Sequence, residues 1–329
     1  MEELRGTVGN GSRYCLLPGD CEASLVRDVA PESMDLVVTG PPFFQAGMAY
    51  ERPEETWEEH WAGRRKMLDA CVRALRPGTK LALHLADCPN FECHTGLTEE
   101  KLIPAVYADY LRREHGVVLW RRFLWVQPEP WTHYQHVKRL ALPQGGQQVL
   151  VDVARLVESA RPRPRSKREQ SRLGWEYLLV FRKPGPVTEH DLREFACLGW
   201  AGAYLASTQG CAGELQDLPL VSDTEKAWRR EAMWYFPPEP AARTAPERAH
   251  PCPWPVAVPD RLVRLYSSPG EWVLDPYLGS GATAEAALAA GRNIMGYELC
   301  PDYWPLLRAR VERVGACSVE RPPEESVNG

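Results

Sequence analysis

An apolar strand that runs into a glycine turn and then a helix constrains this 329-residue chain more than any other feature of its sequence. Trp272–Asp275 is typical of a buried strand, the two glycines around Ser280 of a tight turn, and residues 283–290 of an alanine-rich helix. A second apolar stretch, residues 293–297, ends at Glu298. Two strands joined by a helix over so short a distance are parallel neighbours, because the helix crosses back over the sheet. The sequence therefore predicts an α/β domain with a parallel sheet.

The N-terminal part of the chain repeats this alternation. A helix opens at Thr56 with a capping box that Glu59 completes. Further strands are expected at residues 14–17, 34–38, 81–85, 122–125 and 176–181. Apolar residues make up 44% of the chain, which is enough for a sizeable core. No apolar run approaches the roughly 20 residues that span a bilayer, and no secretory signal is recognisable, so we expect a cytoplasmic protein.

The glycine turn and the acids at the two strand ends have the chemistry of a nucleoside site. Glycines let the backbone approach a ligand closely at the carboxyl edge of a sheet. Glu298, at the end of the second strand, stands where an acid accepts two ribose hydroxyls. Asp275, at the end of the first, can pair with an ammonium group. An ordinary turn between strand and helix is the alternative, which the two acids disfavour.

A second loop, residues 39–43, follows the strand at 34–38 and contains two consecutive prolines. Paired prolines fix the backbone, so the loop can present its carbonyl oxygens to an exocyclic amine at little entropic cost. Phe43 can stack on a base that has left the duplex. The alternative is a proline-rich turn whose aromatic side chain plugs the core.

A basic run stands out in a chain whose formal net charge is −5. Its members are Arg161, Arg163, Arg165, Lys167, Arg168 and Arg172, with one acid among them. Such a run is typical of a phosphate contact, or alternatively of a solvated loop without a partner.

Together these segments resemble the DNA amino-methyltransferases of bacterial restriction-modification systems, specifically the β group with permuted motifs. Those enzymes carry a catalytic loop Asp/Ser-Pro-Pro-Tyr/Phe, and later in the chain a cofactor loop Asp-Pro-Phe-x-Gly-Ser-Gly-Thr-Thr. Residues 40–43 and 275–283 match these loops in the same order. Gly19-Asp20 resembles the family's turn near the adenine, and residues 233–238 resemble its Trp-x-x-Pro-Pro stretch.

The resemblance implies a Rossmann-like methyltransferase fold, with a mostly parallel seven-stranded sheet, helices on both faces and an irregular target-recognition insert. It implies S-adenosylmethionine as the cofactor and no metal. The implied cofactor-binding residues are Asp20, His250, Pro253, Asp275, Pro276, Tyr277, Gly279, Ser280, Gly281, Thr283 and Glu298. The implied catalytic residues are Thr39, Gly40, Pro41, Pro42 and Phe43. The expected divisions are a catalytic-loop half at 1–125, a basic DNA-contacting insert at 126–175, a core strand at 176–182, a target-recognition region at 183–249, a cofactor-binding half at 250–315 and a disordered tail at 316–329.

Gly40 departs from the family, in which the Asp or Ser side chain accepts a hydrogen bond from the target amine. Thr39 and Phe43 bring the loop closer to the Ser-Pro-Pro-Tyr/Phe enzymes, which make N4-methylcytosine, than to the adenine enzymes, which usually carry Asp. The resemblance thus implies a site-specific methyltransferase of double-stranded DNA, acting on the exocyclic amine of a flipped base, with cytosine N4 favoured. Two alternatives stay open: adenine N6 methylation, and a catalytically weak DNA-binding regulatory module, which Gly40 motivates. A homodimer and a cognate restriction endonuclease are partners that the resemblance also leaves open.

Overall fold

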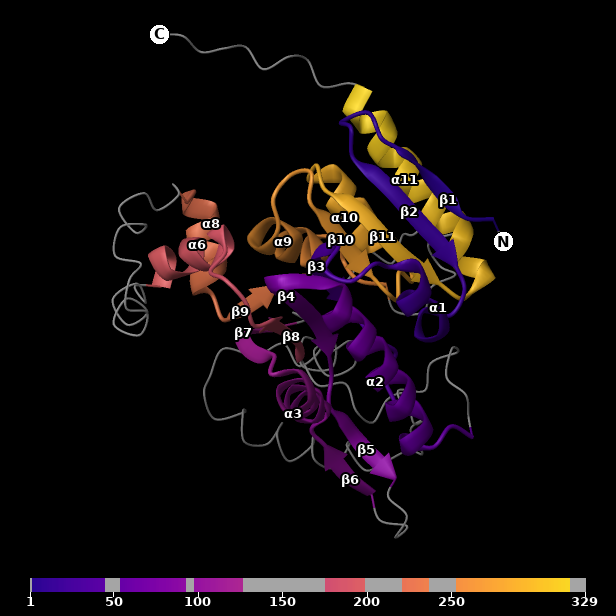
Figure 1. Ribbon diagram of the computed structural model, residues 1–329, viewed down its shortest axis with the longest axis vertical. Helices are drawn as coiled ribbons and strands as arrows, with labels where there is room; N and C mark the ends of the chain where they lie inside the picture. The colour runs from indigo at the N-terminus through magenta and orange to yellow at the C-terminus, as the bar shows by residue number, and fades with distance from the viewer. Residues whose placement is uncertain are drawn as a thin grey trace, which may run out of the picture.

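The computed structural model describes residues 2–44, 54–92, 98–126, 175–198, 221–236 and 253–319. A large central sheet runs through these residues (Figure 1). Its strands are β1 (Leu4–Thr7), β2 (Arg13–Pro18), β3 (Met34–Thr39), β4 (Leu75–Leu85), β7 (Val118–Val126), β8 (Trp175–Arg182), β9 (Met233–Tyr235), β10 (Trp272–Asp275) and β11 (Asn293–Glu298). Two further strands, β5 (Cys88–Glu92) and β6 (Thr98–Lys101), form a separate antiparallel pair.

The central sheet is mostly parallel, in the order β1-β2-β11-β10-β3-β4-β8-β7-β9. Parallel pairing runs without interruption from β2 to β4, and β9 is parallel to β7. The antiparallel pairs are β1 with β2, β8 with β4, and β8 with β7. The expected fold class is confirmed, although the described part of the sheet has nine strands instead of seven. Short edge strands account for the difference: β1 and β9 have four and three residues, too few for a periodic pattern to be recognised in the sequence.

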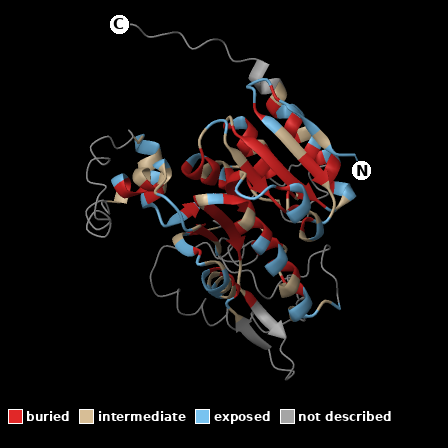
Figure 2. Cartoon of the chain, in the orientation of Figure 1, coloured by how far each residue is buried: buried red, intermediate tan, exposed pale blue. Residues whose placement is uncertain are grey.

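Helices cover both faces of the sheet, as the resemblance implied (Figures 1 and 2). They are α1 (Cys21–Asp28), α2 (Trp57–Ala74), α3 (Ile103–His115), α6 (Glu189–Leu198), α8 (Asp223–Arg230), α9 (Ala257–Tyr266), α10 (Ala282–Ala289) and α11 (Trp304–Val319), with a 3-10 turn η4 (Pro301–Tyr303) before the last. Helices α1, α2 and α3 contribute to one buried cluster, and α9, α10 and α11 to a second. Side chains of β3 and β4 enter both clusters, so these strands are buried on both faces, as a doubly wound sheet requires.

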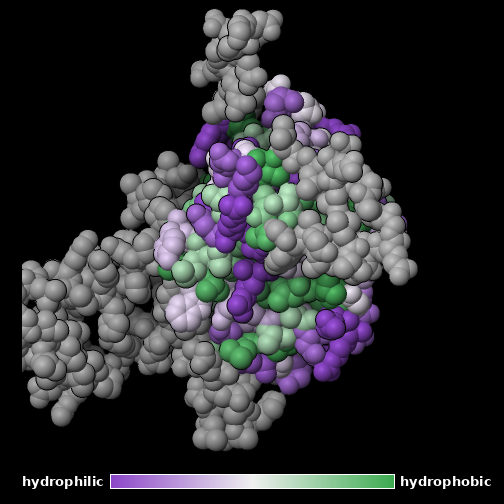
Figure 3. Space-filling view, turned by 90° about the vertical axis from the view of Figure 1, so that its left-hand side faces the viewer, coloured by the Kyte–Doolittle hydropathy of each residue, from purple (hydrophilic) through white to green (hydrophobic). Residues whose placement is uncertain are grey.

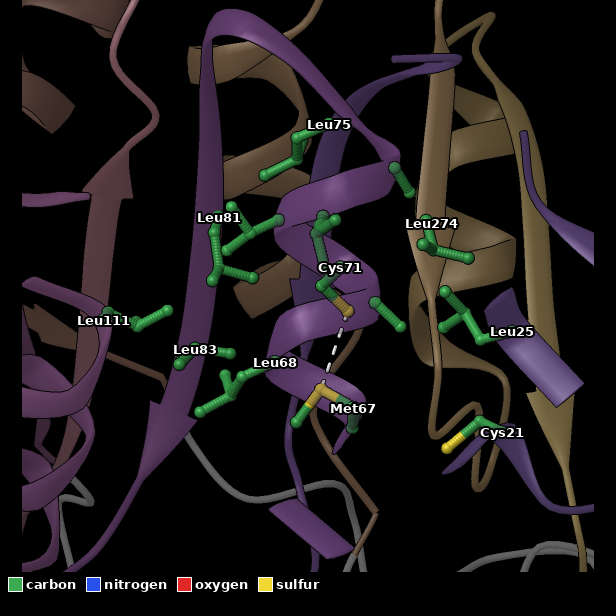
Figure 4. Close-up of a cluster of buried hydrophobic side chains, with 14 of the residues drawn as sticks. Cys21, Leu25, Met67, Leu68, Cys71, Leu75, Leu81, Leu83, Leu111 and Leu274 are labelled. Atoms are coloured by element: carbon green, nitrogen blue, oxygen red, sulfur yellow. Dashed lines mark hydrogen bonds between the residues drawn. The ribbon is translucent and has the colours of Figure 1, made fainter. Parts of the chain in front are cut away.

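The core beneath α2 shows how this packing holds the sheet. Met67, Leu68 and Cys71 of the helix belong to one buried cluster with Leu81 of β4 and Leu274 of β10 (Figure 4). Cys71 Sγ lies 3.5 Å from Met67 Sδ, one helical turn away. The capping box at Thr56 fixes the start of this helix, as its sequence predicts. The helix therefore orients the strand ends that it covers.

The last helix and the surface of the molecule complete the description of the fold. The sequence pattern at residues 303–314 predicts a last helix that Gly315 stops. Helix α11 instead continues to Val319, because Gly315 is not among the glycines with positive φ and does not break the helix. On the face shown in Figure 3, a hydrophilic band runs between hydrophobic areas. Among the described residues, no helix is both long and apolar enough to span a membrane.

Candidate active site

Five neighbouring parallel strands end at the same edge of the sheet, and the site lies there. Gly19 follows β2, Glu298 ends β11, Asp275 ends β10, Thr39 ends β3, and His84 lies one residue before the end of β4. A cavity of about 670 Å³ occupies this edge. Its position is where open α/β sheets bind their ligands.

Both sequence motifs meet in the wall of this one cavity. The expected site residues that line it are Asp20, Gly40, Pro41, Pro42, Phe43, Pro253, Asp275, Pro276, Tyr277, Gly279, Ser280, Thr283 and Glu298. Thr39 and Gly281 are buried beside the wall. The structure therefore brings together two segments that lie more than 200 residues apart in the sequence. His250, Arg161, Arg163, Arg165, Lys167, Arg168 and Arg172 lie outside the described residues.

The glycine turn adopts a conformation that only glycine takes readily. Gly279 and Gly281 have φ values of +50° and +81°, in the left-handed region. A Cβ on Gly281 would also lie 2.6 Å from Leu307 Cδ2 of α11. The two glycines thus let the turn close under helix α10 and expose its backbone to the cavity.

Two buried carboxylates face the cavity from neighbouring strand ends. Glu298 accepts hydrogen bonds from the backbone N–H of Gly279 and of Cys300, each at 2.7 Å. Asp275 Oδ1 accepts from Thr39 Oγ1 at 2.7 Å and from the backbone N–H of Tyr277 at 3.0 Å. Burial raises the pKa of Glu298 to about 7 and the pKa of Asp275 to about 6. Both groups therefore ionise more readily when a cation or a set of hydrogen-bond donors binds next to them.

Tyr277 stands where the family usually has Phe, and its hydroxyl has a specific partner. It donates to Glu22 Oε1 of α1 at 2.8 Å. Arg64 of α2 donates to the same oxygen at 2.5 Å, and its guanidinium lies 5.1 Å from the centre of the Tyr277 ring. Asp20 caps α1 by accepting from the backbone N–H of Glu22 at 2.9 Å. These contacts hold the loop at residues 275–283 against helices α1 and α2.

The loop at residues 39–43, with its two prolines, also forms part of the wall of the cavity. Pro41 is buried, while Pro42 and Phe43 are half-buried and line the cavity. The Phe43 ring meets the His84 imidazole edge to face, with centroids 5.4 Å apart. Phe43 is therefore placed at the cavity wall, where a planar ligand can reach it.

Several residues of the wall were missed by sequence reasoning, and three of them, His84, Glu176 and Trp254, form one hydrogen-bonded group. Trp254 Nε1 donates to His84 Nδ1 at 2.6 Å, and His84 Nε2 lies 2.5 Å from Glu176 Oε2. The available signal was indirect, since His84 falls at the end of an expected strand. Trp125 lies in an expected strand, and from the sequence its ring belongs either in the core, which we favour, or in the base pocket. In the structure it is both buried and part of the wall.

The side chains of Trp254 and His84 leave no space for a side chain at residue 40. A Cβ at this position would lie 2.8 Å from Trp254 Cζ2 and 3.3 Å from His84 Nδ1. Real Cβ atoms essentially never approach a heavy atom within 3.0 Å. The space that an Asp or Ser side chain takes in the resembling enzymes is thus filled by an indole and an imidazole.

Comparison with protein families gives one extended match. The model of a family described as DNA methylase, of the N6/N4 type, matches residues 34–308. Among individual relatives, the type II methyltransferase M.MthZI of Methanothermobacter thermautotrophicus is 34% identical over 143 residues, which are 41% of this chain and 34% of that protein. The type II methyltransferase M.BglI of Bacillus subtilis is 37% identical over 138 residues, or 42% of this chain and 31% of that protein. These matches span about a third of the length of the curated relatives.

Solved structures are similar over nearly the whole chain, at low sequence identity. TTHA0409 of Thermus thermophilus, in complex with S-adenosyl-L-methionine, has a TM-score of 0.57 and 21% identity, covering 91% of this chain and 93% of its own. The PvuII cytosine-N4-specific DNA methyltransferase has a TM-score of 0.56 and 16% identity, covering 96% of this chain and 95% of its own. These likenesses confirm the Rossmann-like fold.

Proposed function

Because the chain belongs to the N6/N4 family of DNA methylases, we propose that it transfers a methyl group from S-adenosylmethionine to the exocyclic amine of a base in DNA, with cytosine N4 as the acceptor. The observation that carries this proposal is the single cavity that both loops share. The loop at residues 275–283 has the features of a nucleoside site, and the loop at residues 39–43 has those of a site for an exocyclic amine. Methyl transfer requires the cofactor and the target base to meet.

The size of the cavity and the acceptor groups in its wall fit S-adenosylmethionine. A volume of about 670 Å³ is in the range of small-molecule sites. Two carboxylates held by backbone amides suit a ligand that carries ribose hydroxyls and positive charge. Glu298 would accept the ribose hydroxyls, Asp275 would face the ammonium group, and Asp20 would lie near the adenine. When bound, this cofactor supplies an electrophilic methyl group on a sulfonium.

The diproline loop would hold the acceptor. An exocyclic amine is a poor nucleophile because its lone pair is delocalised into the ring. Hydrogen bonds from the amine to the carbonyls of Gly40 and Pro41 would favour a pyramidal nitrogen, and Phe43 would stack on the base. Fixing the amine against the donor then supplies much of the acceleration. No cysteine nucleophile is needed for transfer to nitrogen.

Cytosine N4 is the proposed acceptor because the loop is closer to the Ser-Pro-Pro-Tyr/Phe enzymes than to those with Asp. Thr39 and Phe43 support this choice. Adenine N6 is the second candidate, since both amines present the same donor geometry to a carbonyl. The basic run at 161–172 is proposed to contact the phosphates of double-stranded DNA. A homodimer and a cognate restriction endonuclease stay predictions of the resemblance.

The test is methyl transfer to duplex DNA of mixed sequence from a cofactor labelled in its methyl group. Hydrolysis to nucleosides and mass spectrometry then identify the product. We expect labelled N4-methylcytosine, and we expect Asp275→Ala to abolish it. Asp223→Ala, which changes an exposed carboxylate on α8, is the matched control and should leave the yield unchanged.

Each outcome has a definite meaning. Labelled N6-methyladenine would overturn the choice of base but keep the reaction. No labelled nucleoside from any DNA, in a protein that binds the cofactor, would refute methyl transfer and favour the regulatory module.

A further inference from the structure

We infer that His84 is the group that takes the proton from the target amine, oriented by Glu176, and that it replaces the side chain that Gly40 lacks. This inference rests on the proposed function. It starts from the hydrogen bonds of one imidazole, which the structure places between the catalytic-type loop and strand β8.

The partners of His84 determine which ring nitrogen carries the proton. An indole N–H can only donate, so Nδ1 of His84, which receives it from Trp254 at 2.6 Å, is unprotonated. The proton of the neutral ring is therefore on Nε2, which donates to Glu176 Oε2 at 2.5 Å. A carboxylate that holds one nitrogen of an imidazole leaves the other as a basic lone pair, and it stabilises the imidazolium that forms.

The basic nitrogen lies next to the position where the family's side chain is missing. His84 Nδ1 is 3.3 Å from the point that a Cβ of residue 40 would occupy. The oxygen of an Asp or Ser side chain lies one or two bonds from its Cβ, roughly 1.4–2.4 Å. Nδ1 is therefore farther from that point than such an oxygen, by about 1–2 Å, and borders the same space. Gly40 and His84 both line the cavity. The acceptor that residue 40 cannot provide is thus available from the neighbouring strand.

Trp254 shows that this nitrogen is suited to an N–H donor. Its indole N–H is bound to Nδ1 while its ring edge covers Gly40. Trp254 is only half-buried, so its ring has room to shift. When a target amine enters, one N–H donor would replace another on Nδ1, and the number of hydrogen bonds to the imidazole would not change.

The chemical step balances with these groups alone. The amine nitrogen forms a bond to the methyl carbon as the bond between that carbon and sulfur breaks. The electron pair of the broken carbon–sulfur bond stays on sulfur. The amine proton passes to His84 Nδ1 and gives an imidazolium, whose Nε2–H remains bound to the Glu176 carboxylate. Release of that proton to water returns the neutral ring. Groups that accept a proton in this way typically contribute about 10² to 10⁴ in rate.

The experiment measures the single-turnover rate constant of methyl transfer, at saturating cofactor and DNA, for His84→Gln, Glu176→Gln and Trp254→Phe. We expect a loss of about 10²-fold for His84→Gln, because glutamine fills similar space but takes no proton. Glu176→Gln keeps a hydrogen-bond acceptor for Nε2 but loses the charge, so a smaller loss of about tenfold is expected. Cofactor and DNA dissociation constants should stay within threefold of the wild type.

A matched control separates this role from a general effect of removing an imidazole. His115 of α3 forms a similar pair with Asp69, at 2.7 Å, outside the cavity. His115→Gln should leave the rate constant unchanged. The ¹⁵N spectrum of the His84 ring gives a readout that does not depend on turnover, and it should show an unprotonated Nδ1 and a protonated Nε2.

Trp254→Phe distinguishes a proton acceptor from a structural support. If His84 only held the indole in place, removing the indole N–H would cost as much as removing the imidazole. We expect Trp254→Phe to raise the rate constant, because it frees Nδ1. Equal losses for Trp254→Phe and His84→Gln, or a His84→Gln rate within threefold of the wild type, would overturn the inference. A wild-type protein that methylates no DNA would instead refute the proposed function on which the inference rests.

Discussion

Replacing Gly40 by Ser introduces into this protein a side chain that its family commonly has, and we expect it to destabilise the fold. The new Cβ would lie 2.8 Å from Trp254 Cζ2, whereas ordinary contacts begin at 3.4 Å. The indole has to move by several tenths of an ångström. That movement stretches or breaks its hydrogen bond to His84, which is 2.6 Å long.

The size of the effect follows from these two contributions. Overpacking a filled site typically costs about 1–3 kcal/mol. Loss of a neutral hydrogen bond costs about 0.5–1.5 kcal/mol more if it is not remade. Because Trp254 is half-buried and can partly yield, we expect Gly40→Ser to lower the free energy of unfolding by about 2 kcal/mol.

Urea denaturation followed by circular dichroism measures this loss, and a double-mutant cycle assigns it. In a Trp254→Ala background, Gly40→Ser should cost less than about 0.5 kcal/mol, because the clash is gone. Gly315→Ser in helix α11 is the matched control, since nothing lies within 4 Å of its added Cβ and its φ is not positive. The same loss with and without the indole would refute the argument that Trp254 excludes a side chain at residue 40.

Four further predictions follow from the site. Cofactor affinity should fall by up to about tenfold per pH unit as the pH drops below 7, because only the ionised form of Glu298, whose raised pKa is about 7, accepts the ribose hydroxyls. Calorimetry should show a weaker pH dependence of the affinity for Glu298→Gln. Equal pH dependences for the wild type and this variant would contradict the prediction. Phe43→Ala should weaken binding of substrate DNA by about 1–3 kcal/mol without changing cofactor affinity, and a fluorescence titration measures both. Unchanged DNA binding would mean that the ring only fills the core. Tyr277→Phe should cost about 1 kcal/mol of unfolding free energy by loss of its bond to Glu22, while a drop in cofactor affinity would mean that the hydroxyl has a binding role. Replacing the six basic residues at 161–172 by Ala should reduce the salt dependence of DNA binding, and an unchanged slope would remove that run from the interface.

The parallel half of the fold could be predicted from the sequence because each element carries a local signal. The strand Trp272–Asp275 is apolar and ends at a turn whose glycines have positive φ, and the capping box at Thr56 marks the start of α2. The edge strands β1 and β9 were not predicted, because they are short and are defined by pairing with distant strands. The end of α11 was placed too early, because glycine is compatible with a helix unless a left-handed residue is needed there.

The site was predictable to the extent that its residues lie in motifs with a fixed order. The loops at residues 40–43 and 275–283 were matched to the catalytic and cofactor motifs of one enzyme family, and they line one cavity. The group formed by His84, Glu176 and Trp254 was beyond sequence reasoning, because it depends on β8 lying antiparallel to β4 and on a tryptophan 170 residues away from the histidine. Gly40 appeared as a missing acceptor in the sequence, and only the packing around it shows what takes its place.

A crystal structure of the protein with duplex DNA and sinefungin, an amine analogue of the cofactor, tests the central claim most directly. It should show the analogue bound between Asp275 and Glu298, with a single base turned out of the helix against Phe43 and its exocyclic amine directed at the analogue. A base that stays stacked in the duplex, or an analogue bound away from the edge where β3 and β10 end, would contradict the account.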